Sequence, residues 1–301
     1  SVYVPALSCG AAGACVAGGK FLTPSYGDRA YVVTMTEGTW TPAAPVRILT
    51  VGINPDASVT SVACVAVDAC AAGGHGELAP GVESAAPDAR VDGVTCTAPG
   101  ACVAGGRFTD GDGDLRAFVA TMTGGVWDTA VPLTYVGGEN ATAYARVNAV
   151  SCGASGECVA VGSFTDVAGD LRAFVATMTG GVWGAGAPVT FAPGVEGAAP
   201  DARSVSVSCA APGACVAGGS FRDATGGQQA VSDAYVSEVS CARTGACVAV
   251  GTYLDPAGDQ PAFVLVMQDG VWGVAQPVAF DPGVERAEPG ATARSVSCAS
   301  D

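Results

Sequence analysis

The chain has 301 residues, of which 49% are hydrophobic and 14% are charged, so it holds enough apolar material for a core and lacks the composition of a disordered protein. Its net charge of −15 argues against a nucleic-acid partner, because thirteen Lys and Arg residues cannot easily assemble the basic surface that phosphates require. Gly, Pro, Ser or Asp interrupts each apolar run, which excludes a membrane-spanning helix of about twenty residues.

Cysteines are the most regular feature of the sequence. Twelve of the thirteen form pairs with five residues between the two members, a spacing that matches neither a zinc site nor a C-x-x-C redox motif. Two cysteines that face each other across a hairpin have Cα atoms about 5.5 Å apart, which suits a disulfide. We therefore predict six local disulfides and an oxidising compartment, so that the protein is extracellular or displayed on a cell surface. The pairs are Cys9 with Cys15, Cys64 with Cys70, Cys96 with Cys102, Cys152 with Cys158, Cys209 with Cys215, and Cys241 with Cys247.

The cysteine pairs mark internal repeats. From the first cysteine of each pair to the next, and finally to Cys298, the steps are 55, 32, 56, 57, 32 and 57 residues. This order of long, short and long occurs twice, which indicates a duplicated block. We predict three repeats in residues 1–145, then three more and the start of a seventh in residues 146–301, all within a single propeller-like domain.

The long repeats are typical of strands joined by tight turns. In residues 150–190, VSC and CVAVGSF flank a turn, a polar loop leads to LRAFVATM, and the turn TGG precedes VWGAGAPVTF. Alternation places Phe174, Ala176 and Met178 on one face of a strand, and Val175 and Thr177 on the other. We predict four antiparallel strands in each of four long repeats of about 56 residues, and two strands in each of two short repeats of about 32 residues.

Units of this kind indicate an all-β, β-propeller-like fold with about six repeats. The motifs VSCGASGECVAVG and GGVW resemble those of a family of secreted bacterial repeat proteins, in which a V-S-C…C-x-A-V-G hairpin is followed by a G-x-W hairpin. The resemblance covers nearly the whole chain and implies a propeller-like fold, with no common activity. The short repeats depart from this pattern, so an open, solenoid-like β stack is the alternative.

Aromatic residues and methionines recur once per repeat, and we interpret them as core between repeats rather than as a sugar-binding platform. Each long repeat has a Met and a Trp five residues apart, across a hairpin turn: Met35 and Trp40, Met122 and Trp127, Met178 and Trp183, and Met267 and Trp272. An aromatic residue also ends the second strand in five repeats: Phe21, Phe108, Phe164, Phe221 and Tyr253.

An acidic loop follows the second strand in three long repeats: DGDGD at 110–114, DVAGD at 166–170 and DPAGD at 255–259. Alternating carboxylates can supply oxygen ligands to Ca²⁺, and Asp110, Asp112 and Asp114 resemble the start of the calcium loops of integrin-type propeller repeats. The distal acidic ligand is missing, and Asp and Gly also form turns without metal. We favour the metal-free turn, keep calcium as the alternative, and expect no other cofactor.

The remaining candidate sites are weaker. His75 is the only histidine, and no nucleophile motif accompanies it or the nearby Glu77, so we interpret it as a solvated loop residue. A propeller can collect the two carboxylates of a glycoside hydrolase from different blades, but nothing in this sequence singles out such a pair. Asn140 begins a glycosylation sequon. The similar segments 79–90, 192–203 and 281–294 are interpreted as linkers kept by duplication, with a repeated surface patch as the alternative.

Cys298 is the thirteenth cysteine and has no partner at the usual spacing. Its surroundings, SVSC, repeat the first strand of a unit. We favour a chain that continues into another repeat, and two alternatives stay open: a last strand that completes an earlier sheet with a free thiol, and an intermolecular disulfide.

These features favour a non-enzymatic adhesion or ligand-binding module, in which loops from several blades contact a protein or glycan ligand. One alternative is a structural subunit of an extracellular filament or surface layer, whose partners are copies of itself. Another is a carbohydrate-active enzyme on a propeller. A binder should show an exposed aromatic or polar patch, a filament should have complementary ends, and an enzyme should gather unrepeated carboxylates in a central pocket.

Overall fold

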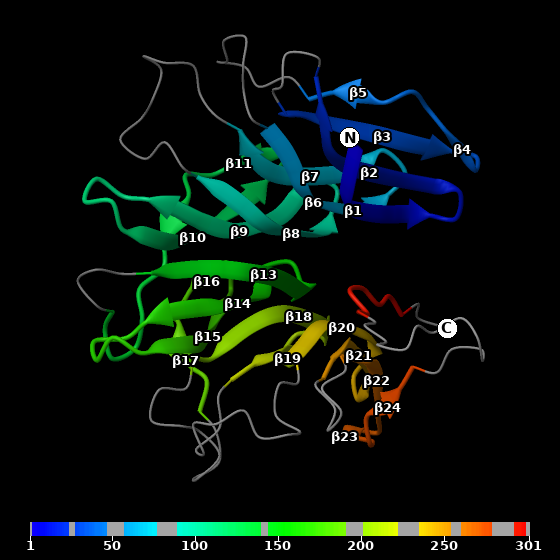
Figure 1. Cartoon of the computed structure of the whole chain (residues 1–301). Coiled ribbons are helices and arrows are strands. Elements are labelled where there is room, and N and C mark those ends of the chain that lie inside the picture. The colour runs from blue at the N-terminus through cyan, green and yellow to red at the C-terminus, as the bar shows by residue number, and fades with distance from the viewer. Residues whose placement is uncertain are drawn as a thin grey trace. The chain divides into compact units, whose positions relative to one another are not determined.

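The computed structural model describes residues 2–23, 28–46, 57–76, 89–139, 144–190, 201–221, 235–253, 260–278 and 292–298. Every regular element in these ranges is a β-strand, which confirms the predicted all-β class (Figure 1). The described residues therefore hold no helix long and apolar enough to span a bilayer. The chain divides into two compact units, Ser1–Leu133 with Thr142–Val150, and Thr134–Ala141 with Ser151–Asp301.

The first unit contains two five-stranded antiparallel sheets and one two-stranded hairpin between them in the sequence. The first sheet has the order β1-β2-β3-β4, with β5 also paired to β3: β1 (Val2–Ala11), β2 (Ala14–Leu22), β3 (Asp28–Thr36), β4 (Thr39–Trp40) and β5 (Ala44–Pro45). The short repeat is the hairpin of β6 (Ala57–Ala66) and β7 (Ala69–Gly76). The next sheet is built in the same way as the first: β8 (Arg90–Ala98), β9 (Ala101–Thr109), β10 (Leu115–Thr123), β11 (Val126–Trp127) and β12 (Val131–Pro132).

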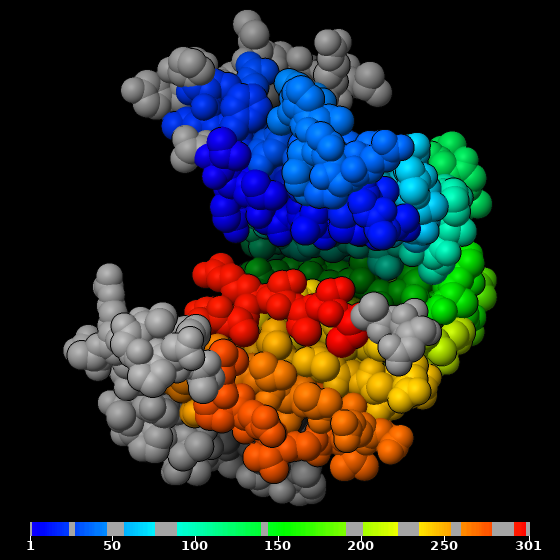
Figure 2. All heavy atoms as spheres, turned by 90° about the vertical axis from the view of Figure 1, so that its right-hand side faces the viewer, coloured from blue at the N-terminus to red at the C-terminus, as the bar shows by residue number. Residues whose placement is uncertain are grey.

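The later part of the sequence repeats this series. A five-stranded sheet consists of β13 (Ala145–Ala154), β14 (Glu157–Thr165), β15 (Leu171–Thr179), β16 (Val182–Trp183) and β17 (Ala187–Pro188). A hairpin of β18 (Arg203–Ala211) and β19 (Ala214–Ser220) follows. The last sheet consists of β20 (Tyr235–Arg243), β21 (Ala246–Thr252), β22 (Ala262–Gln268), β23 (Val271–Trp272) and β24 (Gln276–Pro277). Residues 292–298 lie on this repeat as an extended segment, drawn in red in Figure 2.

The sheets have the up-and-down order of propeller blades, and successive repeats pack against each other within each unit. The chain is therefore propeller-like at the level of its blades, while the predicted count of six repeats and their closure in one domain stay predictions. The predicted fourth strand of each long repeat is interrupted. Val182–Trp183 and Ala187–Pro188 both pair with β15, but the amide of Gly186 between them donates to the carbonyl of Thr134 instead, so one predicted strand becomes two short ones.

Each predicted cysteine pair is joined by a disulfide across a hairpin. The two cysteines are direct partners in the strand register, with Cα atoms 3.9–4.1 Å apart. The turn between them needs one residue in the left-handed region, and Gly13, with φ of 73°, illustrates why most of these turns carry glycine. Asp68 takes this position in the first short repeat, with φ of 62°.

Successive repeats fit together through a glycine and a valine. A Cβ atom added to Gly105 in β9 would lie 2.5 Å from Val147 Cγ1 in the first strand of the next repeat. The same fit joins Gly18 to Val59, Gly73 to Val91, and Gly218 to Val236. In the fourth repeat the glycine position is occupied by Val161, and the equivalent valine of the following repeat is replaced by Ser204; both residues are buried. A larger residue at the glycine position is therefore accompanied by a smaller residue at the valine position.

Aromatic side chains fill the interior of each sheet. Phe164 and Phe174 are both fully buried, and their rings meet edge to face, in a pattern that Phe108 and Phe118 repeat in the first unit. The predicted alternation is confirmed, because Phe174, Ala176 and Met178 are buried whereas Val175 is half-buried and Thr177 is exposed. The core interpretation is wrong for Trp40 and Trp127, which are exposed by 43% and 39%, because the two-residue strands that carry them lie at the edge of their sheets.

Candidate functional site

The acidic loops are held by their own hydrogen bonds. In the loop 110–114, Asp110 Oδ1 accepts hydrogen bonds from the amides of Asp112 and Asp114, both at 3.0 Å, and Arg116 Nε donates to Asp110 Oδ2 at 2.8 Å. The hydrogen bond from Arg116 is the main cause that lowers the pKa of Asp110. This aspartate therefore closes the turn and orients an arginine on the next strand, β10.

The second acidic loop repeats this arrangement in the other unit. Asp166 Oδ1 accepts from the amides of Ala168 and Asp170, and Asp166 Oδ2 accepts from Arg172 Nε at 3.0 Å. Burial acts to raise the pKa of Asp166, but the hydrogen bonds from Asp170 and Arg172 outweigh it and lower the pKa. Among the described residues, no group of three or more His, Cys, Asp or Glu side chains is placed to hold a metal ion. In both loops, the first aspartate is engaged in hydrogen bonds within its own turn.

His75 lies on β7 and not in a solvated loop, so that interpretation is wrong. The ladder with β6 continues through Ser58 and His75 to the end of the strand, although the sequence GGHG suggests a turn. The imidazole is half-buried, and its Nδ1 has no hydrogen-bond partner among the described residues. Burial, and then the positive charges of Arg90 and Lys20, hold the pKa of His75 below its ordinary value of 6.5.

A row of cationic side chains includes His75. The fifth residue after the second cysteine is Lys20, His75 and Arg107 in the first three repeats, whereas it is Ser163, Ser220 and Thr252 in the last three. The glycines two positions earlier face the next repeat, and side chains alternate along a strand, so the three cationic residues face the next repeat as well. The positive charges of Lys20 and Arg107 both act to lower the pKa of His75.

Carboxylates neutralise only part of this row. Lys20 forms an ion pair with Asp28, and Arg90 Nε lies 2.5 Å from Asp92 Oδ1. Arg107 is half-buried and has no carboxylate partner among the described residues. Within a chain of net charge −15, this cluster leaves one arginine uncompensated beside an imidazole that can gain a proton. We define Lys20, His75, Arg90 and Arg107 as the basic cluster.

The analysis of the sequence missed the basic cluster because it treated the repeats as equivalent. The signal was present at one aligned position, where the first three repeats carry Lys, His and Arg and the last three carry Ser, Ser and Thr. His75 was considered alone and was assigned to a loop. Its neighbours Lys20 and Arg107 lie more than thirty residues away on either side, so only the packing of repeats brings the three together.

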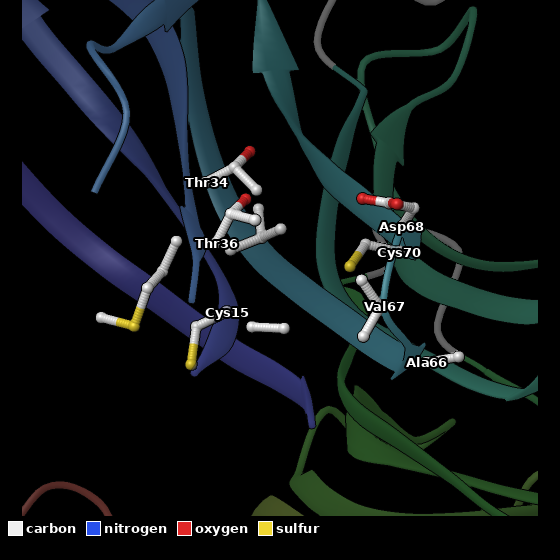
Figure 3. Close-up of a pocket in the computed structure, with 10 residues that line it drawn as sticks. Cys15, Thr34, Thr36, Ala66, Val67, Asp68 and Cys70 are labelled. Atoms are coloured by element: carbon white, nitrogen blue, oxygen red, sulfur yellow. The ribbon is translucent and has the colours of Figure 1, made fainter. Parts of the chain in front are cut away.

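The first unit also has an open cavity of about 240 Å³ (Figure 3). Thr34 and Thr36 of β3 lie on one side, and Val67 and Asp68, in the turn of the short repeat, lie on the other. Asp68 is the only carboxylate among the described residues that line it. A second open cavity of about 340 Å³ lies on the last sheet, where valines and Gln268 and Gln276 line it. Neither cavity contains the pair of carboxylates that glycoside hydrolysis requires.

Several sequence candidates lie outside the described residues: Glu77, the sequon at Asn140, the acidic loop 255–259, and most of the three similar linker segments. Cys298 is described. It is a free, half-buried thiol, whose amide donates to Ser240 Oγ at 3.0 Å and whose Sγ lies 3.6 Å from the Ser240 carbonyl oxygen. The same two distances join Cys209 to Ser151, so Cys298 has the position of a first cysteine in a repeat.

No family model and no curated protein sequence matches the chain. Among solved structures, the chain is similar to the Hadza microbial sialidase Hz136, with 10% identity and a TM-score of 0.36, over 90% of this chain and 46% of that one. The chain thus spans about half the length of that sialidase. It is also similar to a triple arginine-to-alanine mutant of AofleA from Arthrobotrys oligospora, with 9% identity and a TM-score of 0.35, over 91% of this chain and 86% of that one. Likenesses of this size assign neither a family nor an activity.

Proposed function

We propose that this protein is a non-enzymatic, extracellular ligand-binding module, and that the basic cluster of the first unit receives an anionic group of its ligand. One observation supports the proposal above others. The repeats hold Lys20, His75 and Arg107 at a position where their counterparts hold Ser163, Ser220 and Thr252, so the fold does not require a cation there. A feature that the scaffold does not need is a candidate for recognition.

The chemistry of the cluster selects the ligand class. The guanidinium of Arg107, which has no carboxylate partner among the described residues, and the imidazole of His75 provide donors for a carboxylate or a sulfate. Six disulfides fit an oxidising compartment, where acidic glycans carry both groups. We take an acidic glycan as the ligand class.

The proposal is tested with a sulfated glycosaminoglycan, chondroitin sulfate, and its desulfated and carboxyl-reduced form as a neutral control, measured by calorimetry at low and moderate salt. Arg107→Ser and His75→Ser introduce residues that the repeat already uses at this position. We expect Arg107→Ser to weaken binding by roughly tenfold, because a charge-assisted hydrogen bond contributes about 1.5–3 kcal/mol.

Arg243→Ser is the matched control, since it removes one positive charge from an exposed position in the other unit. Equal losses in Arg243→Ser and Arg107→Ser would mean that only the overall charge matters and would contradict a site at the basic cluster. Equal binding of the neutral glycan would contradict the assignment of an anionic ligand.

A further inference from the structure

The cavity of Figure 3 lies between the first repeat and the short repeat that follows it, within the first unit. Two contacts hold its walls in place. The amide of Cys64 donates to Ser8 Oγ at 3.0 Å, and a Cβ atom added to Gly10 would lie 2.2 Å from the carbonyl oxygen of Ala66. The same serine–amide bonds recur elsewhere in the chain and join Cys209 to Ser151 and Cys241 to Ser208. The cavity is therefore formed by the contacts between the repeats themselves.

Asp68 occupies a turn position that the other repeats give to glycine. Two residues before the second cysteine of each pair, the other five repeats carry a glycine with φ of 71–76°: Gly13, Gly100, Gly156, Gly213 and Gly245. Asp68 adopts the same left-handed conformation, with φ of 62°. Aspartate tolerates this region better than most residues do, but glycine adopts it at lower cost. The turn thus forms without a carboxylate, and a strained residue at such a place is a candidate for binding.

The polar groups of the cavity are not used to hold the fold. The carboxylate of Asp68 is exposed and forms no ion pair or hydrogen bond with another described residue. Figure 3 shows it directed across the cavity towards Thr34 and Thr36 of β3. The backbone of Thr34 is bonded to Thr41, but neither hydroxyl of the two lining threonines has a partner among the described residues. One carboxylate and two hydroxyls therefore offer acceptors to the same space.

The remaining lining is mainly apolar. Val67 is exposed by 53% and Met35 is half-buried, and both border the cavity together with the alanines at 14 and 66. The volume of about 240 Å³ lies below the roughly 300–1,000 Å³ of pockets for drug-sized ligands. The cavity thus suits a single narrow group, whose alkyl stem packs on the apolar wall while its polar end reaches the carboxylate.

Charge complementarity selects the polar end of this group. A carboxylate without a counter-ion among the described residues, in a chain of net charge −15, attracts a cation. An ammonium has three N–H donors, which match one carboxylate and two hydroxyls. We propose that the cavity is a binding site for a primary alkylammonium group, whose nitrogen donates to Asp68, Thr34 and Thr36. The group belongs either to a lysine side chain of a polypeptide or to a small free amine.

This site is separate from the basic cluster. Cys15 lines the cavity at the beginning of β2, and Lys20 lies five residues further along the same strand, or about 16 Å away at the usual rise per residue. The described residues that line the cavity include no cationic side chain. The ammonium site therefore adds to the proposed glycan site and does not rest on it.

The experiment is an NMR titration of the oxidised full chain, in which the backbone amide shifts are followed. The probes are n-pentylamine, Nα-acetyl-lysine N-methylamide as a capped lysine, and n-pentanol as a neutral analogue. We expect n-pentylamine to shift the amides of Val67, Asp68 and Thr36 and to bind at least about threefold more tightly than n-pentanol, which is the scale of one exposed ion pair with its hydrogen bond. Shifts caused by the capped lysine as well would identify a polypeptide lysine as a source, whereas shifts caused by n-pentylamine alone would identify a small amine.

Two substitutions separate binding from folding. Asp68→Asn keeps the size of the side chain and removes its charge, and Asp68→Gly introduces the residue of the other five repeats. Both are expected to weaken n-pentylamine binding at least about threefold, and Asp68→Gly is expected to melt no lower than the parent. Asp269→Gly is the matched control, because Asp269 is also an exposed turn residue with positive φ (51°), in the other unit. It is expected to bind n-pentylamine as the parent does.

Four outcomes would overturn the proposal. Equal losses in Asp68→Gly and Asp269→Gly would mean that only the net charge of the chain matters. Equal binding of n-pentanol and n-pentylamine would make the cavity a purely apolar site. Unchanged binding in Asp68→Asn and Asp68→Gly, or no shift of the Asp68 amide, would remove the carboxylate from the site. Glycan binding at the basic cluster is measured separately, and none of these substitutions touches the cluster, so the failure of one proposal is distinguishable from the failure of the other.

Discussion

Enlarging residue 105 while making residue 147 smaller is the most direct test of how the repeats fit together. Gly105→Val would place a Cβ atom 2.5 Å from Val147 Cγ1 and 2.9 Å from Val150 Cγ1, well inside van der Waals contact. Overpacking of this kind costs about 1–3 kcal/mol of unfolding free energy. Val147→Ser, at a fully buried position, removes a methyl-sized volume and adds a hydroxyl, at a cost of about 2–3 kcal/mol.

The double variant should recover most of this loss. It recreates the combination of Val161 with Ser204, in which Val161 is fully buried and Ser204 is exposed by only 7%. Val207 occupies the position of Val150 in that contact, so the native structure already accommodates a valine beside it. We expect the double variant to lie within about 1 kcal/mol of the parent, which gives a coupling energy of at least about 2 kcal/mol.

The assay is urea denaturation of the oxidised protein, followed by far-ultraviolet circular dichroism, for the parent, both single variants and the double variant. All samples keep the six disulfides, so the reference state stays the same across the cycle. If the two single losses add within about 0.5 kcal/mol in the double variant, Gly105 and Val147 do not form an exchangeable contact, and the packing argument is refuted.

Three further predictions concern titration, an acidic loop and metal. Because the folded-state pKa of His75 lies below 6.5, the unfolded chain binds a proton first as the pH falls. His75 should therefore lower the unfolding free energy as the pH falls below about 6.5, until its lowered pKa is passed. In parallel melts, His75→Gln should reduce the difference in unfolding free energy between about pH 7 and pH 5, and an unchanged difference would contradict the burial of this imidazole. Asp166→Ala should destabilise the second unit by about 1 kcal/mol, because it removes the acceptor of two amides and of Arg172, and millimolar CaCl₂ should leave the melting temperature of the parent unchanged, whereas a clear rise would restore calcium as the occupant of these loops.

Local features of the fold could be predicted from the sequence because they depend on neighbouring residues. Each disulfide joins cysteines on one hairpin, and the alternation of Phe174, Ala176 and Met178 is a property of one strand. The interruption of the fourth strand was missed, because the amide of Gly186 turns to Thr134 while the short strands on both sides keep pairing with β15. Periodicity alone does not report such a break.

Features that depend on contacts between repeats were harder to predict. Trp40 and Trp127 recur at the same place as their counterparts, yet their exposure depends on what lies over the edge of each sheet. His75 was assigned to a loop because glycines surround it, although Gly73 is required by the close approach of Val91 and not by a turn. The basic cluster needs three repeats to be stacked before its charges meet.

The contacts between repeats and the proposed ligand site use different positions of the same repeat. Contacts between repeats are carried by the glycine–valine fit and by the serine–amide bonds, as at Gly105 with Val147 and at Ser208 with Cys241. The position of Lys20, His75 and Arg107 is used by neither of these contacts, so a cation can replace a hydroxyl there without disturbing the stack. A duplicated chain can therefore confine a ligand site to one of its blocks while both blocks keep the connection by which repeats follow one another.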